Sequence, residues 1–448
     1  MLQKGKMMSN TKTKTSFQRA GLMACMLMLL AVFCAPPAQA QTRLIVRDQL
    51  GLGGINLTCL LTGCKVVGGL GDPQGQLFLV TFPPVLNPVL ALLKLNLNLP
   101  GVLDVEVDQI VNAQQPTAES DPGYLTDEAP TQYYGATVWH GYLAQPANQL
   151  VRTAQTQSAF KVTGAGTTVA VIDTGVDVTN PILQPVLVNG YDFTRNVSGG
   201  SEMNDVQASP ELSQASVATL NQRTVAVLDQ RTVAVLDGGP YTDFGHGTMT
   251  AGIVHLVAPQ AKIMPLKAFS ANGTGYDSDI LRAIYYAVGH GANVMNMSFD
   301  FTSYSTELAT AVKYANSKGV ISVASAGNDG LKTTVYPGGL PGVIDVASTS
   351  NTDVQSSFTN YGAPPVWLAA PGEGVVTTYP WGTYAAGWGT SFSTPFVAGT
   401  AALMLGKNGN CPAWAVPTGL ANADYLGNQN LGYGRLDTYQ ALQVCQLF

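Results

Sequence analysis

The sequence predicts a three-layer α/β fold, in which a mostly parallel sheet carries helices on both faces, preceded by a small α+β unit. Continuous apolar, β-branched runs such as TTVAVID at 167–173 are typical of strands buried on both faces. These runs alternate with segments of helical periodicity that begin at capping residues or end at glycine. The alternation favours a parallel sheet, whose ligands bind at the carboxyl ends of the strands.

The elements of the larger unit, residues 136–448, follow from these patterns. The segment at 277–291 has an apolar residue at every fourth position, which predicts a helix, and the predicted helix at 305–319 ends in Lys-Gly. Asp173 and Asn328 are polar residues at strand ends. The order predicted after the strand at 167–173 is a helix at 277–291, a strand at 292–298, a helix at 305–319 and a strand at 320–328.

A signal peptide is predicted over residues 1–40. Its start is basic, an apolar run over Gly21–Ala35 follows, and Ala38-Gln39-Ala40 matches the small-x-small pattern of a cleavage site. The apolar run is too short for a stable membrane span. Cys34 would suit a lipid anchor, but the bulky Phe33 before it favours ordinary secretion. We therefore expect an extracellular or periplasmic protein.

The chain that follows residue 40 is acidic. Without the five basic residues of the signal segment, 17 basic residues face 28 acidic ones, which is a formal net charge of −11. Nucleic-acid binding needs a basic face, so the charge argues against this class of partner. No later stretch is long and apolar enough to predict a membrane span.

Three further segments surround the predicted sheet. Residues 41–112 form a small apolar unit that opens with a strand-like RLIVRD. Residues 113–135 are rich in proline, acid and small polar residues, as in an exposed linker. Residues 194–241 interrupt the strand–helix rhythm and indicate an insertion at the rim of the sheet. This insertion contains a perfect tandem repeat of QRTVAVLD at 222–237, from which we expect two short strands.

Four cysteines remain after residue 40. An even number in an exported chain predicts disulfides, and three pairings are possible. Cys59–Cys64 with Cys411–Cys445 is favoured, because both pairs are local and each falls within one predicted unit. A zinc site is the alternative, although no histidine or further cysteine lies beside either pair.

Four short motifs carry polar residues with chemical potential. Taken singly, each fits a turn, a loop or a helix cap. Together they supply the four parts that acyl transfer to a serine needs: a hydroxyl, a base, a carboxylate that orients the base, and donors for the oxyanion. The motifs are VIDTGVD at 171–177, GHGTMTAG at 245–252, SAGNDG at 325–330 and GTSFSTPFVAG at 389–399.

The serine motif predicts a helix that begins beside the hydroxyl. Ser391 precedes an apolar helix, whose free N–H groups and dipole can face developing negative charge. Gly389 lets the chain turn tightly, and Pro395 is expected in the first helical turn, which does not need its N–H. His246 starts a helix of its own, and Asn328 brings a side-chain amide to a strand end.

In this order the motifs resemble those of the subtilisin-like serine peptidases, or subtilases. The resemblance implies that Asp173 orients the base, His246 is the base and Ser391 is the nucleophile. It also implies that Asn328 completes the oxyanion hole with the N–H of Ser391. GANVMNMS at 291–298 is similar to the family's substrate-binding strand. The implied substrate-binding residues are Ser298, Phe299, Asp300, Ala326 and Gly327.

Residues 41–112 are similar to subtilase propeptides, which often end in a phrase like LPGVLDVEVDQ. The resemblance implies that this segment assists folding, inhibits the active site intramolecularly and is then cleaved off. The expected partners are therefore polypeptide substrates and the chain's own propeptide. No cofactor or metal is required for the chemistry. The family often holds structural calcium, but no contiguous acidic loop identifies ligands here.

Two positions depart from the family pattern. Met249 stands where a second histidine is common, and Ser298 is followed by Phe-Asp-Phe where Leu-Gly is common, which predicts a narrowed substrate cleft. The alternative function is a catalytically silent subtilase fold used for binding, although all four catalytic positions are filled. An esterase-type α/β hydrolase is disfavoured, because its order is Ser–Asp–His rather than Asp–His–Ser.

Overall fold

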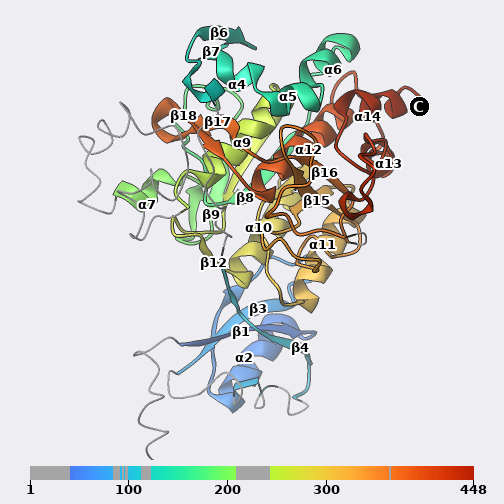
Figure 1. The fold of residues 1–448 in the computed structure, drawn as a ribbon. Coiled ribbons are helices and arrows are strands. Elements are labelled where there is room, and N and C mark those ends of the chain that lie inside the picture. Colours follow the sequence, from blue (N-terminus) through green and yellow to red (C-terminus); the bar gives the residue numbers. More distant parts are fainter. Residues whose placement is uncertain are drawn as a thin grey trace, which may run out of the picture.

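A computed structural model describes residues 41–83, 91–92, 95, 99–112, 123–207, 243–362 and 365–447. Figure 1 shows a small N-terminal unit, drawn in blue, below a larger unit that contains the rest of the chain. The predicted signal segment and the tandem repeat lie outside the described residues. Among the described helices, none combines the length and the apolar character that crossing a membrane requires.

The larger unit is built on one sheet. Its described strands follow the order β10-β9-β11-β8-β13-β14-β15-β16. Only the β9–β10 pair is antiparallel, and every other pair in this sheet is parallel, as the sequence predicts. The strands are β8 (Thr168–Asp173), β9 (Gly190–Asp192), β10 (Val197–Gly199), β11 (Lys262–Lys267), β13 (Val294–Met297), β14 (Ile321–Ser325), β15 (Val343–Thr349) and β16 (Leu368–Pro371).

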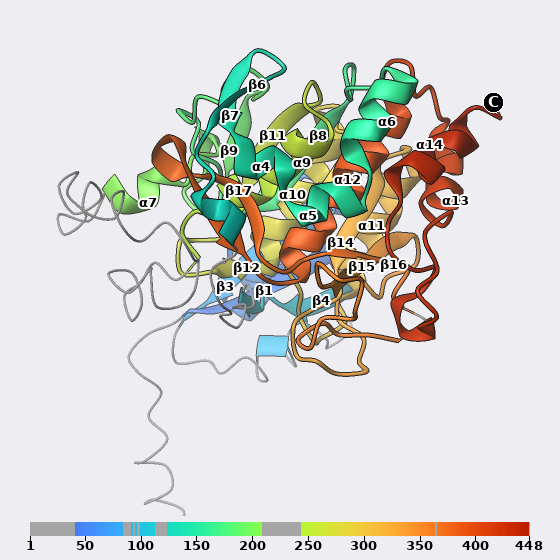
Figure 2. The same cartoon turned by 45° about the horizontal axis from the view of Figure 1, so that its top comes forward.

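Alternate residues of β8 face two different helix layers. Val169 and Val171 belong to the hydrophobic cluster formed with α9 and α12, whereas Ala170 and Ile172 belong to the cluster formed with α10 and α11. Figure 2 shows α9 and α12 side by side against the sheet. The predicted three-layer α/β fold is therefore confirmed. These helices are α9 (His246–Val257), α10 (Asp277–Gly289), α11 (Thr306–Ser317) and α12 (Thr390–Leu405).

Shorter elements surround these layers. The predicted insertion at 194–241 begins with β10 and α7, and its part from 208 onwards lies outside the described residues. The shorter elements are η1 (Gly123–Thr126), β6 (Pro130–Tyr133), β7 (Ala136–Trp139), α4 (His140–Ala144), α5 (Pro146–Leu150), α6 (Thr153–Phe160), α7 (Met203–Gln207), β12 (Thr274–Tyr276), β17 (Val375–Tyr379), η2 (Pro380–Gly382), β18 (Thr383–Gly387), η3 (Ala413–Ala415), α13 (Val416–Leu420), η4 (Gln429–Leu431) and α14 (Thr438–Cys445).

The N-terminal unit is an antiparallel sheet of order β2-β3-β1-β4 with helix α2 packed against it. Its core includes Leu44, Val46 and Ile55, which are fully buried. A further short strand, β5, leaves this unit and pairs with the larger one. The elements are β1 (Thr42–Asp48), α2 (Gly51–Thr62), β2 (Lys65–Gly69), β3 (Leu77–Phe82), β4 (Val102–Val107) and β5 (Ile110–Asn112).

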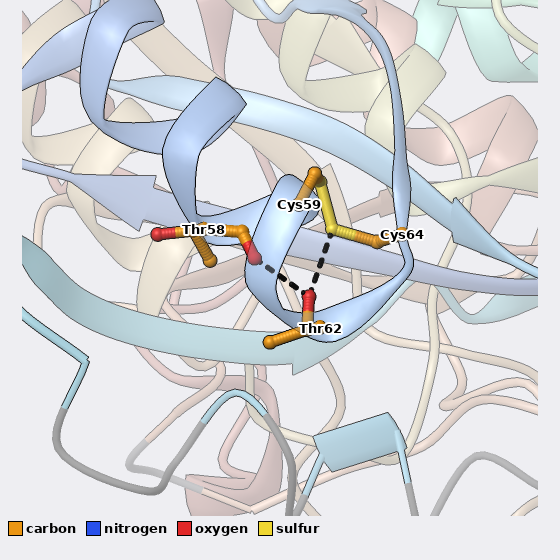
Figure 3. The surroundings of a disulfide bond; sticks show 4 residues. All are labelled: Thr58, Cys59, Thr62 and Cys64. Atoms are coloured by element: carbon orange, nitrogen blue, oxygen red, sulfur yellow. Dashed lines mark hydrogen bonds between the residues drawn. A yellow bond between two sulfur atoms is a disulfide. The ribbon is translucent and has the colours of Figure 1, made fainter.

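The described residues include two disulfides, in the pairing that the sequence analysis favours. Cys59–Cys64 closes the end of α2, where Thr62 Oγ1 donates to Thr58 O over 2.8 Å and to Cys64 Sγ over 3.4 Å (Figure 3). Cys411–Cys445 joins the end of α14 to the segment that follows α12. Each bond therefore ties a helix end to its own unit.

The predicted linker at 113–135 needs a correction over its second half. Residues from Gly123 onwards form η1 and the β6–β7 hairpin on the larger unit. Leu125, 3% exposed, joins the main hydrophobic cluster, and Tyr133 Oη donates to Leu256 O over 2.6 Å. Leu125 and Tyr133 hold the segment in place. They are widely spaced within a polar, proline-rich sequence, so they form no periodic pattern that would predict this packing.

Candidate active site

Asp173 stands where the strand order of the sheet reverses. It is the last residue of β8, which lies between β11 and β13. From β8 the chain first moves to one side of the sheet, to β9 and β10, and it then returns through β11 and crosses β8 to β13 and the later strands on the other side. Crevices at such points, outside the carboxyl ends of parallel strands, are where α/β folds bind ligands. The position of Asp173 therefore follows from the topology.

Asp173 and His246 form a buried pair. His246 Nδ1 donates to Asp173 Oδ1 over 2.7 Å. The carboxylate also accepts from the backbone N–H of Thr174 over 2.7 Å and from Thr250 Oγ1 over 3.1 Å. Gly245, at φ 92°, precedes the histidine, and a Cβ there would collide with the ring of Tyr379. These contacts fix the tautomer and the orientation of the imidazole, leaving Nε2 to accept a proton.

The surroundings of His246 favour its protonated form. Burial alone would lower the pKa of the ring, but the charge and hydrogen bond of Asp173 outweigh it. Asp243 and Glu202 add smaller contributions of the same sign, and together they raise the pKa of His246 to about 8. The ring therefore acts as a free base above that pH and is ready to hold a transferred proton.

Ser391 is the second residue of α12, where helical N–H groups lack intrahelical partners. Gly389 before it has φ 138° and ψ 161°, a conformation that essentially only glycine adopts. Ser391 Oγ donates to Ser298 O over 3.2 Å, and Ser298 Oγ donates to Ser391 O over 2.9 Å. The nucleophile motif is thus joined to the end of β13 by two reciprocal hydrogen bonds.

Pro395 lies in the second turn of α12, not in the first as the sequence predicts. Its missing N–H therefore does remove a helical hydrogen bond, namely the one that Ser391 O would accept. Ser298 Oγ supplies the replacement donor over 2.9 Å. The proline is tolerated because the side chain that directly follows β13 satisfies the carbonyl that it leaves open.

Asn328 lies three residues beyond the end of β14. Its Oδ1 accepts from Thr390 N over 2.8 Å and from Thr390 Oγ1 over 3.0 Å. Thr390 directly precedes Ser391, so these bonds hold the amide against the start of α12 and direct its Nδ2 to the other side. The structure therefore brings Asn328 and Ser391 together at one helix end.

The remaining predicted substrate residues divide into two groups. Ser298 contacts Ser391, and Ala326 and Gly327 lead directly to Asn328. Phe299 instead points into the core, with its ring 5.0 Å from that of Phe269, so only its backbone can face a substrate. Its bulk therefore lies away from the cleft that it was expected to narrow.

Asp300, which directly follows Phe299, is almost fully buried. Burial, with the nearby charge of Asp329, raises the pKa of its carboxyl to about 7. Among the described residues, Asp300 Oδ1 has no hydrogen-bond partner.

The other histidines do not contribute to the pair. His255 is buried in α9, where burial lowers its pKa to about 4. His290 stacks on Tyr286, with ring centroids 3.6 Å apart, and His140 pairs with Asp127 at the surface. Over the described ranges, no group of three or more His, Cys, Asp or Glu side chains is arranged to hold a metal ion.

Sequence reasoning missed Glu202. This carboxyl is fully buried and accepts hydrogen bonds from residues beside both Asp173 and His246. It lies in a segment rich in glycine and serine, and no motif distinguishes it from an ordinary surface acid.

The N-terminal unit contacts the larger unit at β12 and at the start of α10. Its strand β5 pairs antiparallel with β12, matching Ile110 to Tyr276 and Asn112 to Thr274. Asp108 accepts from Ser278 N over 2.9 Å, in the first turn of α10.

Two further contacts join the units. Glu106 accepts from Thr306 N over 2.6 Å, at the start of α11. Arg47 forms a two-pronged ion pair with Glu307 of the same helix. Backbone pairing, two helix caps and an ion pair therefore connect the units.

Comparison with known proteins agrees with this geometry. The family model described as "Subtilase family" matches residues 164–426. The chain therefore belongs to this family of serine peptidases. A thermophilic serine proteinase of Bacillus sp. (strain AK1) is 32% identical over 355 residues, covering 75% of this chain and 76% of that protein. Thermitase of Thermoactinomyces vulgaris is 32% identical over 293 residues, 62% of this chain and 90% of the relative.

A solved structure extends the likeness to the fold of most of the chain. Fervidolysin from Fervidobacterium pennivorans, described as a keratinolytic enzyme related to subtilisin, superposes with a TM-score of 0.68. The superposition covers 90% of this chain and 61% of fervidolysin at 24% identity. At that identity the likeness concerns the fold alone.

Proposed function

We propose that this protein is a secreted serine endopeptidase in which Ser391 is the nucleophile, His246 the general base and Asp173 the residue that orients the base. The buried hydrogen bond of 2.7 Å between Asp173 and His246 is the observation that carries the proposal. The ring of His246 lies edge-on to that of Phe392, with centroids 5.7 Å apart, and Phe392 directly follows Ser391. An imidazole fixed in this tautomer near a serine at a helix N-terminus is the arrangement that acyl transfer needs.

The reaction begins when Ser391 Oγ turns from Ser298 O towards His246. Nε2 of His246 takes the hydroxyl proton as Oγ bonds to the carbonyl carbon of the substrate, and the carbonyl electron pair moves to oxygen. When that pair returns, the C–N bond breaks, and His246 gives its proton to the leaving nitrogen. Water then repeats both steps on the acyl ester, which releases the acid and restores Ser391.

Two donors stabilise the oxyanion in this proposal. The N–H of Ser391 lies at the start of α12, where the helix dipole also favours negative charge. The side-chain amide of Asn328 is the second donor, since its oxygen is already held by Thr390. Such preorganised donors usually supply the largest single part of the stabilisation.

We further propose that residues 41–112 act as an inhibitory propeptide. The β5–β12 pairing supports this, because an extended peptide that adds a strand to an exposed edge is a common mode of peptide recognition. Cleavage would then take place in the segment that follows this unit, for which the sequence predicts a linker and processing region at 113–135.

The proposal is tested by expressing the chain with its signal segment and identifying the N-terminus of the secreted product by mass spectrometry. The Ser391→Ala variant should accumulate as precursor, whereas Ser393→Ala, a buried serine on the same helix, should mature normally. Maturation of Ser391→Ala without added protease would rule out self-processing. A mature protein that neither binds a serine-directed phosphonate nor cleaves a broad peptide library would rule out catalysis.

A further inference from the structure

Glu202 accepts hydrogen bonds from residues next to both Asp173 and His246. Its side chain is fully buried, and its Oε2 accepts from Gly245 N over 2.8 Å and from Thr174 Oγ1 over 3.2 Å. Oε1 accepts from the hydroxyl of Thr248. Thr174 directly follows Asp173, whereas Gly245 and Thr248 flank His246, so one carboxyl connects the two segments that carry the pair.

The connection continues through Thr174. Its Oγ1 also accepts from the N–H of Gly247, over 3.0 Å, in the first turn of α9. Thr248 Oγ1 in turn accepts from Asp177 N over 2.8 Å. Glu202 is therefore the centre of a closed set of hydrogen bonds that fixes the end of β8 against the start of α9. A displacement of either segment would lengthen the contact between Asp173 and His246.

Four charged or titratable groups interact electrostatically with this carboxyl, and they are Asp173 at the end of β8, Lys267 at the end of β11, His246 at the start of α9 and Tyr379 on β17. Two more acids lie around them: Asp205 on α7 pairs with Lys267, and the charge of Asp243 acts on His246.

The hydrogen bonds of Lys267 go elsewhere. Its ammonium group donates to Asp205 over 2.8 Å, to Thr174 O over 2.8 Å and to Phe269 O. Its charge lowers the pKa of Glu202, but burial outweighs it and raises that pKa to about 7. Lys267 therefore does not neutralise Glu202 by direct pairing. The negative charge of Glu202 contributes to the raised pKa of His246.

We propose that Glu202 is a positioning residue of the peptidase reaction, which holds Asp173 and His246 in contact and, through its negative charge, moves the acid limit of catalysis to higher pH. This inference rests on the proposed function, because it concerns the base of that reaction. Ionised Glu202 favours the imidazolium form of His246 and so raises the pH at which the ring becomes a free base. As the pH falls through about 7, Glu202 takes up a proton and this support weakens.

The kinetic test compares Glu202→Gln with Glu202→Ala in the matured protein. Glutamine carries no charge. Its Oε1 can still accept from Gly245 N and Thr174 Oγ1, and its Nε2 can donate to Thr248 Oγ1. The acid limb of kcat/KM should therefore move to lower pH by about half a unit, since the charge is a secondary influence on the ring. Alanine removes the bonds as well, so kcat should fall on the order of 10- to 100-fold with little change in KM. An unmoved acid limb in Glu202→Gln overturns the proposal.

A second measurement does not depend on activity. The chain has four histidines, so NMR can follow the titration of His246 in the uncleaved Ser391→Ala protein, with Glu202 or with Gln at that position. The pKa of His246 should be lower in the Glu202→Gln protein. An unchanged value overturns the inference about Glu202. A lowered value in a protein whose wild type shows no turnover supports the inference and contradicts only the proposed function.

Asp437→Asn is the matched control. Asp437 is buried, caps α14 by accepting from Gln440 N over 2.9 Å, and pairs with Arg152. Its replacement should lower the melting temperature and leave both the acid limb and the His246 titration in place. If Asp437→Asn moves them as far as Glu202→Gln does, the effect reflects general loosening, and the proposal is wrong.

Discussion

Two sets of carboxyl groups hold the starts of helices in this molecule, and they differ in where they come from. Glu202 belongs to the larger unit and accepts from Gly245 N, directly before α9. Glu106 and Asp108 belong to the N-terminal unit and accept from the first turns of α11 and α10. All use the same physical preference of a helix N-terminus for negative charge.

The difference concerns permanence. The contacts around Glu202 lie within one folded unit, so they last as long as the fold does. The contacts of Glu106 and Asp108 cross between units, so they would end on the proposed removal of the N-terminal unit. On the proposed function, carboxyl groups at helix starts support the chemistry where they are internal and restrain it where they are shared between units. Changes at the two places should accordingly alter different measurements.

The largest effect is expected inside the larger unit, at Asp173→Asn. The amide would present N–H or oxygen to Nδ1 and no longer fix the productive tautomer, so kcat should fall about 10⁴-fold. Steady-state kinetics on a peptide substrate measure this. Asp353→Asn, which breaks an ion pair with Arg435 outside the site, should leave kcat within about twofold. A small loss at Asp173 would contradict its assigned role.

The second prediction concerns the pH dependence of docking between the units. Asp277 starts α10, its N–H donates to Gln109 O over 3.1 Å, and neither of its carboxyl oxygens has a hydrogen-bond partner among the described residues. Burial, with the charges of Asp108 and Glu106, raises its pKa to about 7. Because departure of the N-terminal unit exposes Asp277, docking takes up a proton between the ordinary aspartate pKa and about 7.

Docking should therefore be tightest in acid and weaken by up to about tenfold per pH unit until the pH reaches about 7. The measurement is the fraction of cleaved N-terminal unit that stays bound to the larger unit across this range. Asp277→Asn should make the curve shallower, because the amide carries no proton to release, while Glu106, whose pKa is also raised by burial, still contributes. A wild-type curve that is flat, or that rises with pH, would contradict this account.

The sequence was sufficient wherever a residue's role depends on its neighbours in the chain. Asp173, His246 and Ser391 each lie at the junction of a buried strand or an apolar helix with a glycine turn, and such junctions are visible as local patterns. The three-layer fold follows in the same way, because alternating strands and helices leave few arrangements of a parallel sheet.

The sequence was insufficient where a role depends on distant partners. Glu202 acts across 43 residues on Gly245, and Glu106 across 200 on Thr306, and neither acid lies in a distinctive pattern. The direction of Phe299 depends on the packing of Phe269 from another strand end. Pro395 was misplaced by one turn because the start of a helix depends on its cap geometry.

The smallest effects are expected at the two caps between the units. Glu106→Ala and Asp108→Ala should each weaken docking by about 1 kcal/mol, the usual value of a helix cap, or roughly fivefold. In the uncleaved Ser391→Ala protein, this loss appears as faster hydrogen exchange of the β5–β12 amides, which open when the units separate. The measurement is made at pH 8, where the Asp277 contribution no longer changes.

Glu128→Ala is the control, because Glu128 is an exposed acid of the larger unit and caps neither of these helices. It should leave the exchange of the β5–β12 amides unchanged. Combining Glu106→Ala with Asp108→Ala should multiply the two accelerations, since they cap different helices. If neither replacement accelerates exchange, the caps do not hold the units together, and the docking energy resides in the strand pairing and in Arg47 with Glu307.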